Sequence, residues 1–224
     1  MEYLIHLAIL VAIYSILALS LNLVVGYTGI LSVTHAAFFG LGAYATAILG
    51  TQFGVNFFVG MFAGIIVSAI FALLIGSVLN KFRGDFVALG SVGFNMIVWS
   101  VFLNWQELTR GPLGIPGISR PELFGFSFAD NFSFLLLAIV FAVFVYVFSR
   151  FITSSSFGRV LKAIREDEEA LQVFGYRALH YKLAVFVIGA SMAAVAGSLF
   201  ASYITFIDPS TFTINESIFL LSVI

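Results

Sequence analysis

Residues 181–206 read YKLAVFVIGASMAAVAGSLFASYITF and contain one charged residue, Lys182. A helix of about 20 apolar residues crosses the roughly 30 Å hydrocarbon core of a bilayer, so this stretch predicts a transmembrane helix. Small residues recur along it at every fourth position, at Gly189, Ala193, Gly197 and Ala201. They share one face, where small side chains let a second helix approach closely in lipid. The stripe favours helix packing; lining of a translocation path is the alternative.

The rest of the chain has the same apolar character. Of its 224 residues, 61% are hydrophobic and 9% are charged, whereas soluble domains are about 45–50% apolar. Further apolar runs of spanning length occur at residues 3–26, 30–50, 55–79, 86–105 and 132–151. We therefore expect an all-α polytopic transmembrane helical bundle of about six helices, formed by residues 1–224 as a single domain. Residues 217–224 are apolar but too few to cross a bilayer, so we expect an incomplete C-terminal span.

Several function classes find no support in the residues. The chain has no cysteine, so neither a disulfide framework nor a thiolate metal site is expected. It has no Gly-Lys-Ser or Gly-Lys-Thr phosphate-binding loop, so ATP hydrolysis on this polypeptide is not expected. Its ten lysines and arginines are dispersed, which argues against nucleic-acid binding. We expect no catalytic residue, no metal site and no cofactor, and the lipid bilayer as surroundings.

A charged segment at residues 154–180, SSSFGRVLKAIREDEEALQVFGYRALH, interrupts the apolar pattern. Serines 154–156 can cap a helix beginning at Phe157, and Asp167 can cap a second short helix. Gly175 suits the left-handed position that follows a helix end, and Leu171 and Phe174 supply an apolar face. The segment thus predicts two short helices outside the bilayer that dock into a soluble partner. An interfacial amphipathic loop without a partner is the alternative.

Lysine and arginine in short loops mark the cytoplasmic side of a membrane protein. Lys81 and Arg83 lie in one loop, and the charged segment 154–180 lies two crossings later. We expect both on the cytoplasmic side, and the loops at 106–131 and 207–216 on the external side. The N-terminus is external if residues 30–50 cross the membrane fully, and internal if they form a re-entrant segment.

Polar residues inside membrane helices tend to face the bundle interior or a water-filled route. Thr34, His35 and Asn95 are our candidates for the translocation path, with interhelical hydrogen bonding as the alternative. Acidic residues lie in loops or near helix ends on the sequence pattern, which argues against an ion-coupled secondary transporter. A membrane enzyme would need a nucleophile and base or a metal cluster, and neither is apparent.

Longer motifs carry a family resemblance. They are LNLVVGYTGILSVTHAAFFGLGAYATAIL (21–49), FRGDFVALGSVGF (82–94), TRGPLGIPGISRPELFGFSF (109–128) and YKLAVFVIGASMAAVAGSLFA (181–201). Together they resemble branched-chain amino-acid ABC-transporter permeases, and the proline-rich stretch at 109–128 favours the LivM family. EALQVFG at 169–175 is similar to the EAA motif of ABC-importer membrane subunits, with Leu171 in place of the usual second alanine.

The resemblance implies a function. The chain would be a permease subunit of an ATP-driven importer in the inner membrane, coupling ATP hydrolysis on a partner to alternating access. Its implied partners are a second homologous permease subunit, two ATP-binding subunits and an extracytoplasmic solute-binding protein. Glu168, Glu169, Ala170 and Gly175 would form the core of the ATPase contact, to which we add Arg165 from its place between the two short helices. Urea, short amides and other amino acids are the alternative substrates.

Overall fold

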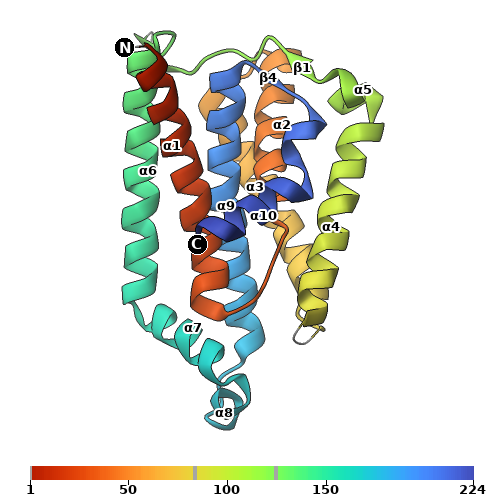
Figure 1. The fold of residues 1–224 in the computed structure, drawn as a ribbon, viewed down its shortest axis with the longest axis vertical. Helices are drawn as coiled ribbons and strands as arrows, with labels where there is room; N and C mark the ends of the chain where they lie inside the picture. Colours follow the sequence, from red (N-terminus) through yellow and green to blue (C-terminus); the bar gives the residue numbers. More distant parts are fainter. Residues whose placement is uncertain (1, 83–84, 124–125) are drawn as a thin grey trace.

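The computed structural model describes residues 2–82, 85–123 and 126–224, and its architecture is a bundle of long apolar helices (Figure 1). Six helical stretches in this part of the chain are long and apolar enough to cross a membrane, which confirms the predicted fold class. The long helices are α1 (Glu2–Leu21), α2 (His35–Phe53), α3 (Phe57–Leu79), α4 (Asp85–Asn104), α6 (Asn131–Ser154) and α9 (Ala178–Ile204). A π-helical segment, η1 (Asn22–Gly26), prolongs α1.

Short elements connect the long helices. They are α5 (Gln106–Thr109), η2 (Gly111–Leu113), β1 (Ile115–Pro116), β2 (Glu122–Leu123), β3 (Phe126–Ser127), α7 (Ser156–Glu166), α8 (Glu168–Val173), β4 (Phe206–Ile207), η3 (Pro209–Phe212) and α10 (Ile214–Val223). Strand β1 pairs antiparallel with β4, with Ile115 opposite Ile207. This pairing joins the loop at 106–131 to the start of 207–216, so the prediction that these two loops meet on one side is confirmed.

The two ends of the bundle differ in what they carry. Figure 1 shows the N-terminus at the same end as β1 and β4, and α7 and α8 at the opposite end. Asn80 and Phe82 line one cavity together with Glu168 and Lys182, so the loop after α3 lies at the α7–α8 end, as expected. Arg83 of that loop lies outside the described residues. On the predicted orientation, the N-terminus is external.

Helix α9 lies at the centre of the bundle, between α1, α2 and α3 (Figure 1). Its small residues face α2 at very short range. A Cβ added at Gly197 would lie 1.9 Å from the carbonyl oxygen of Phe39, and one added at Gly42 would lie 2.2 Å from that of Ala194. Ala193 is fully buried. Glycines on both helices therefore let the two backbones touch, which is how helices associate closely in lipid.

The second apolar run is not one continuous helix. Residues 29–34 form no regular secondary structure, and α2 begins at His35 and not at Ile30 as the pattern predicted. In Figure 1 this connector rises from the α7–α8 end to the middle of the bundle, where α2 starts. Its backbone is held by polar side chains of α4: the Val33 N–H donates to Ser91 Oγ (2.9 Å), and Asn95 Nδ2 donates to the Val33 carbonyl (2.8 Å). Non-helical backbone at membrane depth requires such internal partners.

Two glycines on long helices test the packing of α9 against α2. We expect Gly197→Ala to destabilise the protein by about 1–3 kcal/mol, because overpacking forces the two backbones apart. Gly93→Ala on α4 is the matched control, since a Cβ there meets no atom within 4 Å. Thermal denaturation of the detergent-purified variants measures the difference. Equal melting temperatures for the two variants would show that α2 and α9 are not in backbone contact.

Candidate functional site

The first candidate site is the helix pair α7 and α8, whose ends are set by local sequence. Asp167 Oδ1 accepts from the Ala170 N–H at 2.9 Å, so the predicted N-cap of the second helix is confirmed. For the first helix the cap is Ser155, whose Oγ accepts a long 3.5 Å hydrogen bond from the Gly158 N–H. This helix begins at Ser156, one residue earlier than predicted.

Gly175 ends α8 in the left-handed conformation, with φ 83°. Its N–H donates to the Gln172 carbonyl at 2.9 Å, and the Tyr176 N–H donates to the Leu171 carbonyl at 3.4 Å. These two bonds form a Schellman motif, in which a glycine after the helix satisfies the last carbonyls. The predicted role of Gly175 as a helix stop is confirmed.

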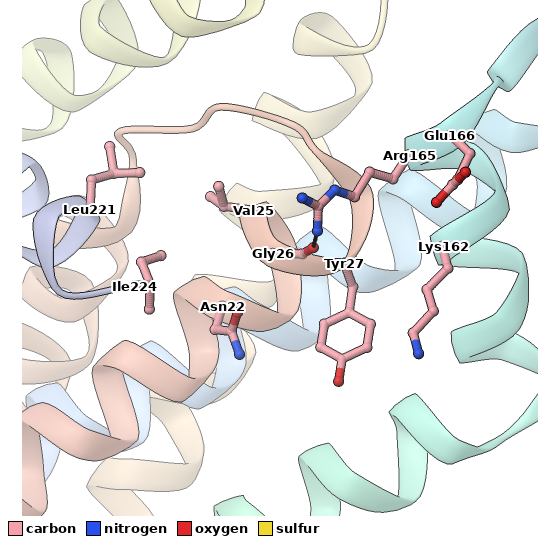
Figure 2. Close-up of a pocket in the computed structure, with 9 residues that line it drawn as sticks. All are labelled: Asn22, Val25, Gly26, Tyr27, Lys162, Arg165, Glu166, Leu221 and Ile224. Carbon is pink, nitrogen blue, oxygen red and sulfur yellow. Dashed lines mark hydrogen bonds between the residues drawn. The ribbon is translucent and has the colours of Figure 1, made fainter.

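Side chains of α7 attach the pair to the membrane bundle (Figure 2). Leu161 and Ile164 are buried. Arg165 Nη1 donates to the Gly26 carbonyl at 2.5 Å, and its aliphatic stem lies against Gly29. Lys162 Nζ lies 5.5 Å from the ring centroid of Tyr27. Helix α7 therefore contacts the chain where η1 ends and the non-helical connector begins.

A second attachment joins α8 to α9. Lys182, in the first turns of α9, forms a salt bridge with Glu168. A cavity of about 550 Å³ borders this ion pair, and Glu169 and Gln172 also line it. A second cavity, of about 750 Å³, is lined by Arg165, Asn22 and Lys162 (Figure 2). Each cavity is larger than a water site, so the helix pair does not pack flat against the bundle.

The tip of α8 projects away from the bundle and carries apolar side chains. None of the six residues of α8 is buried. Val173 is 87% exposed and Phe174 is 80% exposed, while Leu171 packs partly against the core. The predicted apolar face of Leu171 and Phe174 is thus wrong in its geometry: Leu171 turns inward, and Val173 and Phe174 form the exposed pair. Sequence reasoning missed Val173, although it stands next to Phe174 in the motif.

The second candidate site lies in the middle of the bundle. Asn95 is the central residue of the span Phe86–Asn104. Its Nδ2 donates to Ser217 Oγ of α10 at 3.1 Å, and the same hydroxyl accepts from the Ala36 N–H at the start of α2 at 2.9 Å. The first turn of α10 therefore joins α2 and α4 at mid-depth. We call Ser91, Asn95, Ser217 and the backbone they hold at residues 33–36 the midplane cluster.

The structure brings Thr34, His35 and Asn95 close together in this region, all of them buried. The Thr34 hydroxyl shares a hydrogen bond with Ser32 Oγ at 2.8 Å. His35 packs edge-on to Phe38, and the Ser20 carbonyl lies near its ring without an ordinary hydrogen-bond geometry. Asn95 makes the interhelical hydrogen bonds that were the alternative interpretation. Their predicted role in the translocation path remains a prediction.

The position of Glu216 contradicts the prediction that residues 207–216 form an external loop. The pattern placed residues 207–216 in an external loop, but η3 and α10 turn back into the bundle. Tyr14 is the central residue of the span Glu2–Gly26, and its hydroxyl donates to Glu216 Oε1 at 2.6 Å. An acidic side chain therefore lies at mid-depth, which sequence reasoning missed. Pro209 and the polar residues around it suggested a loop, and only the tertiary fold shows where the chain goes next.

Residues 3–224 match the family model described as "Branched-chain amino acid transport system / permease component". The chain is 34% identical to the high-affinity branched-chain amino acid transport system permease protein LivM of Salmonella typhimurium and 33% identical to that of Escherichia coli. Each match covers 98% of this chain and 57% of the relative, so the chain spans little more than half their length.

A more distant relative is the permease protein LivH of Escherichia coli, 28% identical over 88% of this chain and 68% of the relative. The higher identity to LivM agrees with the predicted side of the permease pair. No solved structure matches the chain.

Serines 217 and 222 of α10 test the midplane cluster. We expect Ser217→Ala to cost about 1–3 kcal/mol of stability, because the buried Ala36 N–H and the Asn95 amide lose their acceptor. Ser222→Ala is the control, since the exposed Ser222 hydroxyl bonds only within its own helix, to the Phe219 carbonyl. Thermal unfolding of both purified variants provides the measurement. No difference between them would mean that Ser217 does not hold α2 and α4 together.

Gly175 tests whether the shape of α8 matters to the site. A Cβ at this position meets no atom within 4 Å, so a substitution acts only through the left-handed backbone. We expect Gly175→Val to reduce association with the ATP-binding subunit that the family resemblance implies, by about tenfold, while the membrane bundle stays folded, since β-branched residues strongly disfavour positive φ. Gly175→Asn should retain most of it, because asparagine tolerates this conformation. Co-purification of the ATP-binding subunit with each variant measures this association. An equal loss of association in Gly175→Val and Gly175→Asn would refute the backbone explanation.

Proposed function

The chain belongs to the permease family of branched-chain amino acid transport systems, and from this premise we propose that it is the permease subunit of an ATP-driven importer of branched-chain amino acids. In this proposal it works by alternating access in the inner membrane, as a single transmembrane domain that contains the coupling loop 154–180. The relatives are permease proteins, and the described residues include six candidate spans. Both observations support a multi-pass transporter subunit.

The observation that carries the proposal is the projecting tip of α8. Exposed apolar side chains outside the bilayer mark surfaces that bind a partner. Val173 and Phe174 stand at the end of a short, well-capped helix, which is the shape that inserts into a groove. The sequence contains no Gly-Lys-Ser or Gly-Lys-Thr phosphate-binding loop, so in this proposal ATP is hydrolysed on such a partner. An ATP-binding subunit fits this requirement, and two of them would serve this chain and a homologous permease subunit.

Contacts of α7 and α8 give the partner a mechanical hold on the bundle. Arg165 donates a hydrogen bond to the Gly26 carbonyl at the end of η1, and Glu168 forms a salt bridge with Lys182 at the start of α9. A displacement of α8 by the ATPase would therefore act on both helices. Since α9 packs in backbone contact with α2, it would move α2 as a unit and alter access to the interior. Arg165, Glu168, Glu169, Ala170 and Gly175 are the residues that we assign to this coupling, with Val173 and Phe174 as its apolar anchor.

Two other interpretations remain open to experiment. The mid-depth carboxylate of Glu216 favours an ion-coupled secondary transporter, since such residues serve proton and ion pathways. Urea, short amides or another amino acid would be the substrate if a different solute-binding protein delivers it. Uptake by proteoliposomes that contain the purified complex separates these cases. We expect uptake of leucine, isoleucine and valine that requires ATP and the solute-binding protein. Uptake driven by an ion gradient without ATP would contradict the proposal.

The apolar anchor gives the sharpest test of coupling. We expect Phe174→Ser to weaken binding of the ATP-binding subunit by about 30-fold, the cost of about 2 kcal/mol typical of a buried aromatic anchor. Leu113→Ser is the matched control, because Leu113 is 82% exposed at the opposite end of the bundle. Titration of the ATPase against both variants in nanodiscs gives the affinities. Unchanged affinity with Phe174→Ser would show that the tip of α8 is not the docking surface.

A further inference from the structure

A groove of about 640 Å³ runs between α1 and α10, and its volume lies within the range of small-molecule sites. Most of its wall is aliphatic or aromatic, with Leu10, Val11 and Ala18 on α1 and Phe219 and Val223 on α10. At its centre lie Tyr14 and Glu216. We call this space the Glu216 groove.

Among the described residues, no positively charged side chain pairs with the carboxylate in this groove. Tyr14 donates to Oε1, and among the described residues no side chain donates to Oε2. No lysine, arginine or histidine lines the groove. The depth of Tyr14 in its span, about 18 Å from either end at 1.5 Å per residue, places the carboxylate near the middle of the membrane. A carboxylate facing hydrocarbon there is costly, so this position favours a polar or cationic partner for Glu216.

We propose that the Glu216 groove binds an aliphatic α-amino acid during transport, with the Glu216 carboxylate holding its ammonium group and the apolar wall holding its side chain. The inference rests on the proposed function and names the residues that meet the substrate within it. A ligand with one ammonium group and a branched aliphatic chain matches a groove with one carboxylate and an aliphatic wall.

The Glu216 groove has a different role from the midplane cluster. Ser217 points to α2 and α4, whereas Glu216, its neighbour, points to α1. One helical turn thus fastens the bundle on one side and presents a charge on the other. Movement of α1 or α2 would change the distance between Tyr14 and Glu216, so the same turn can hold the ligand in one state and release it in another.

Protection of an introduced thiol tests the groove in the full complex. The chain has no cysteine, so Ser15→Cys places a single thiol of this chain on the groove wall. Ser77→Cys on α3 is the control, because Ser15 and Ser77 are both exposed serines bonded to a carbonyl of their own helix. The reagent is a charged, water-soluble thiosulfonate, applied to the complex held with and without nucleotide. We expect the Ser15→Cys thiol to react in at least one state, and leucine to slow that reaction.

Three comparisons make the test specific. Glu216→Gln in the Ser15→Cys background should raise the leucine concentration for half protection by about tenfold or more, as loss of a charge-assisted contact does. Tyr14→Phe should keep most of the protection, since it leaves the carboxylate in place. 4-Methylpentanoate, which is leucine without its amino group, should not protect. Labelling of the Ser77→Cys thiol should be indifferent to leucine in every variant.

Other outcomes would overturn the proposal. A Ser15→Cys thiol that never reacts would mean that the groove is closed by lipid or by a partner subunit. Equal protection by leucine and 4-methylpentanoate would rule out the proposed contact between Glu216 and the ammonium group. Protection that survives Glu216→Gln would do the same. Loss of a pH dependence of uptake in Glu216→Gln, with leucine protection intact, would assign the carboxylate to proton movement. Uptake by the unaltered complex reports on the proposed function separately, so leucine uptake without leucine protection refutes only the site.

Discussion

An unpaired backbone group in hydrocarbon costs several kcal/mol, and this constraint governs the centre of the molecule. The chain breaks its second span at residues 29–34, where no helix supplies partners for the backbone. Side chains of other helices therefore take that role, with Ser91 and Asn95 from α4 and Ser217 from α10. Once they do, α2, α4 and α10 are fixed to one another at mid-depth. The packing of α9 against α2 and the position of Glu216 both follow from that arrangement.

Features that depend on neighbouring residues in the chain could be predicted from the sequence. The six spans found among the described residues follow from hydropathy alone, and the small-residue stripe of α9 is used for packing as its spacing indicates, with Gly197 against α2 and Gly189 against Ser20 and Val24. The ends of α8 were predictable because both signals are local. Asp167 accepts from the N–H of Ala170, three positions later, and the N–H groups of Gly175 and Tyr176 donate to the carbonyls of Gln172 and Leu171. Such features need no knowledge of the fold.

Features that depend on distant partners were not readable. Residues 30–34 look like the start of an apolar helix, but they are non-helical, and residues 58, 62 and 181 positions away supply hydrogen bonds at this point. Glu216 looked like a loop residue, since nothing near it in the chain reveals that Tyr14, 202 positions away, meets it inside the bundle. The inward turn of Leu171 likewise depends on packing against the core and not on the period of its own short helix.

The connector at residues 27–34 links the two candidate sites. Arg165 and Lys162 contact its beginning, and the midplane cluster holds its end. Beyond Gly29 the connector has no helical ladder; its own hydrogen bonds join the Ile30 N–H to Thr28 Oγ1 and the Ser32 hydroxyl to Thr34. Motion imposed at the tip of α8 would thus reach the start of α2 over a short length of chain, which is what coupling of a partner's ATP hydrolysis to alternating access requires.

The position of α8 relative to the membrane and to the ATPase is the most direct test of this account. A single Gln172→Cys substitution places a thiol at an exposed position of α8, in a chain without other cysteines. Labelling of sealed, oriented vesicles with an impermeant thiol reagent should succeed only from the cytoplasmic side, and the bound ATP-binding subunit should protect the thiol. Labelling from the external side, or full reactivity with the ATPase bound, would contradict both the topology and the proposed coupling.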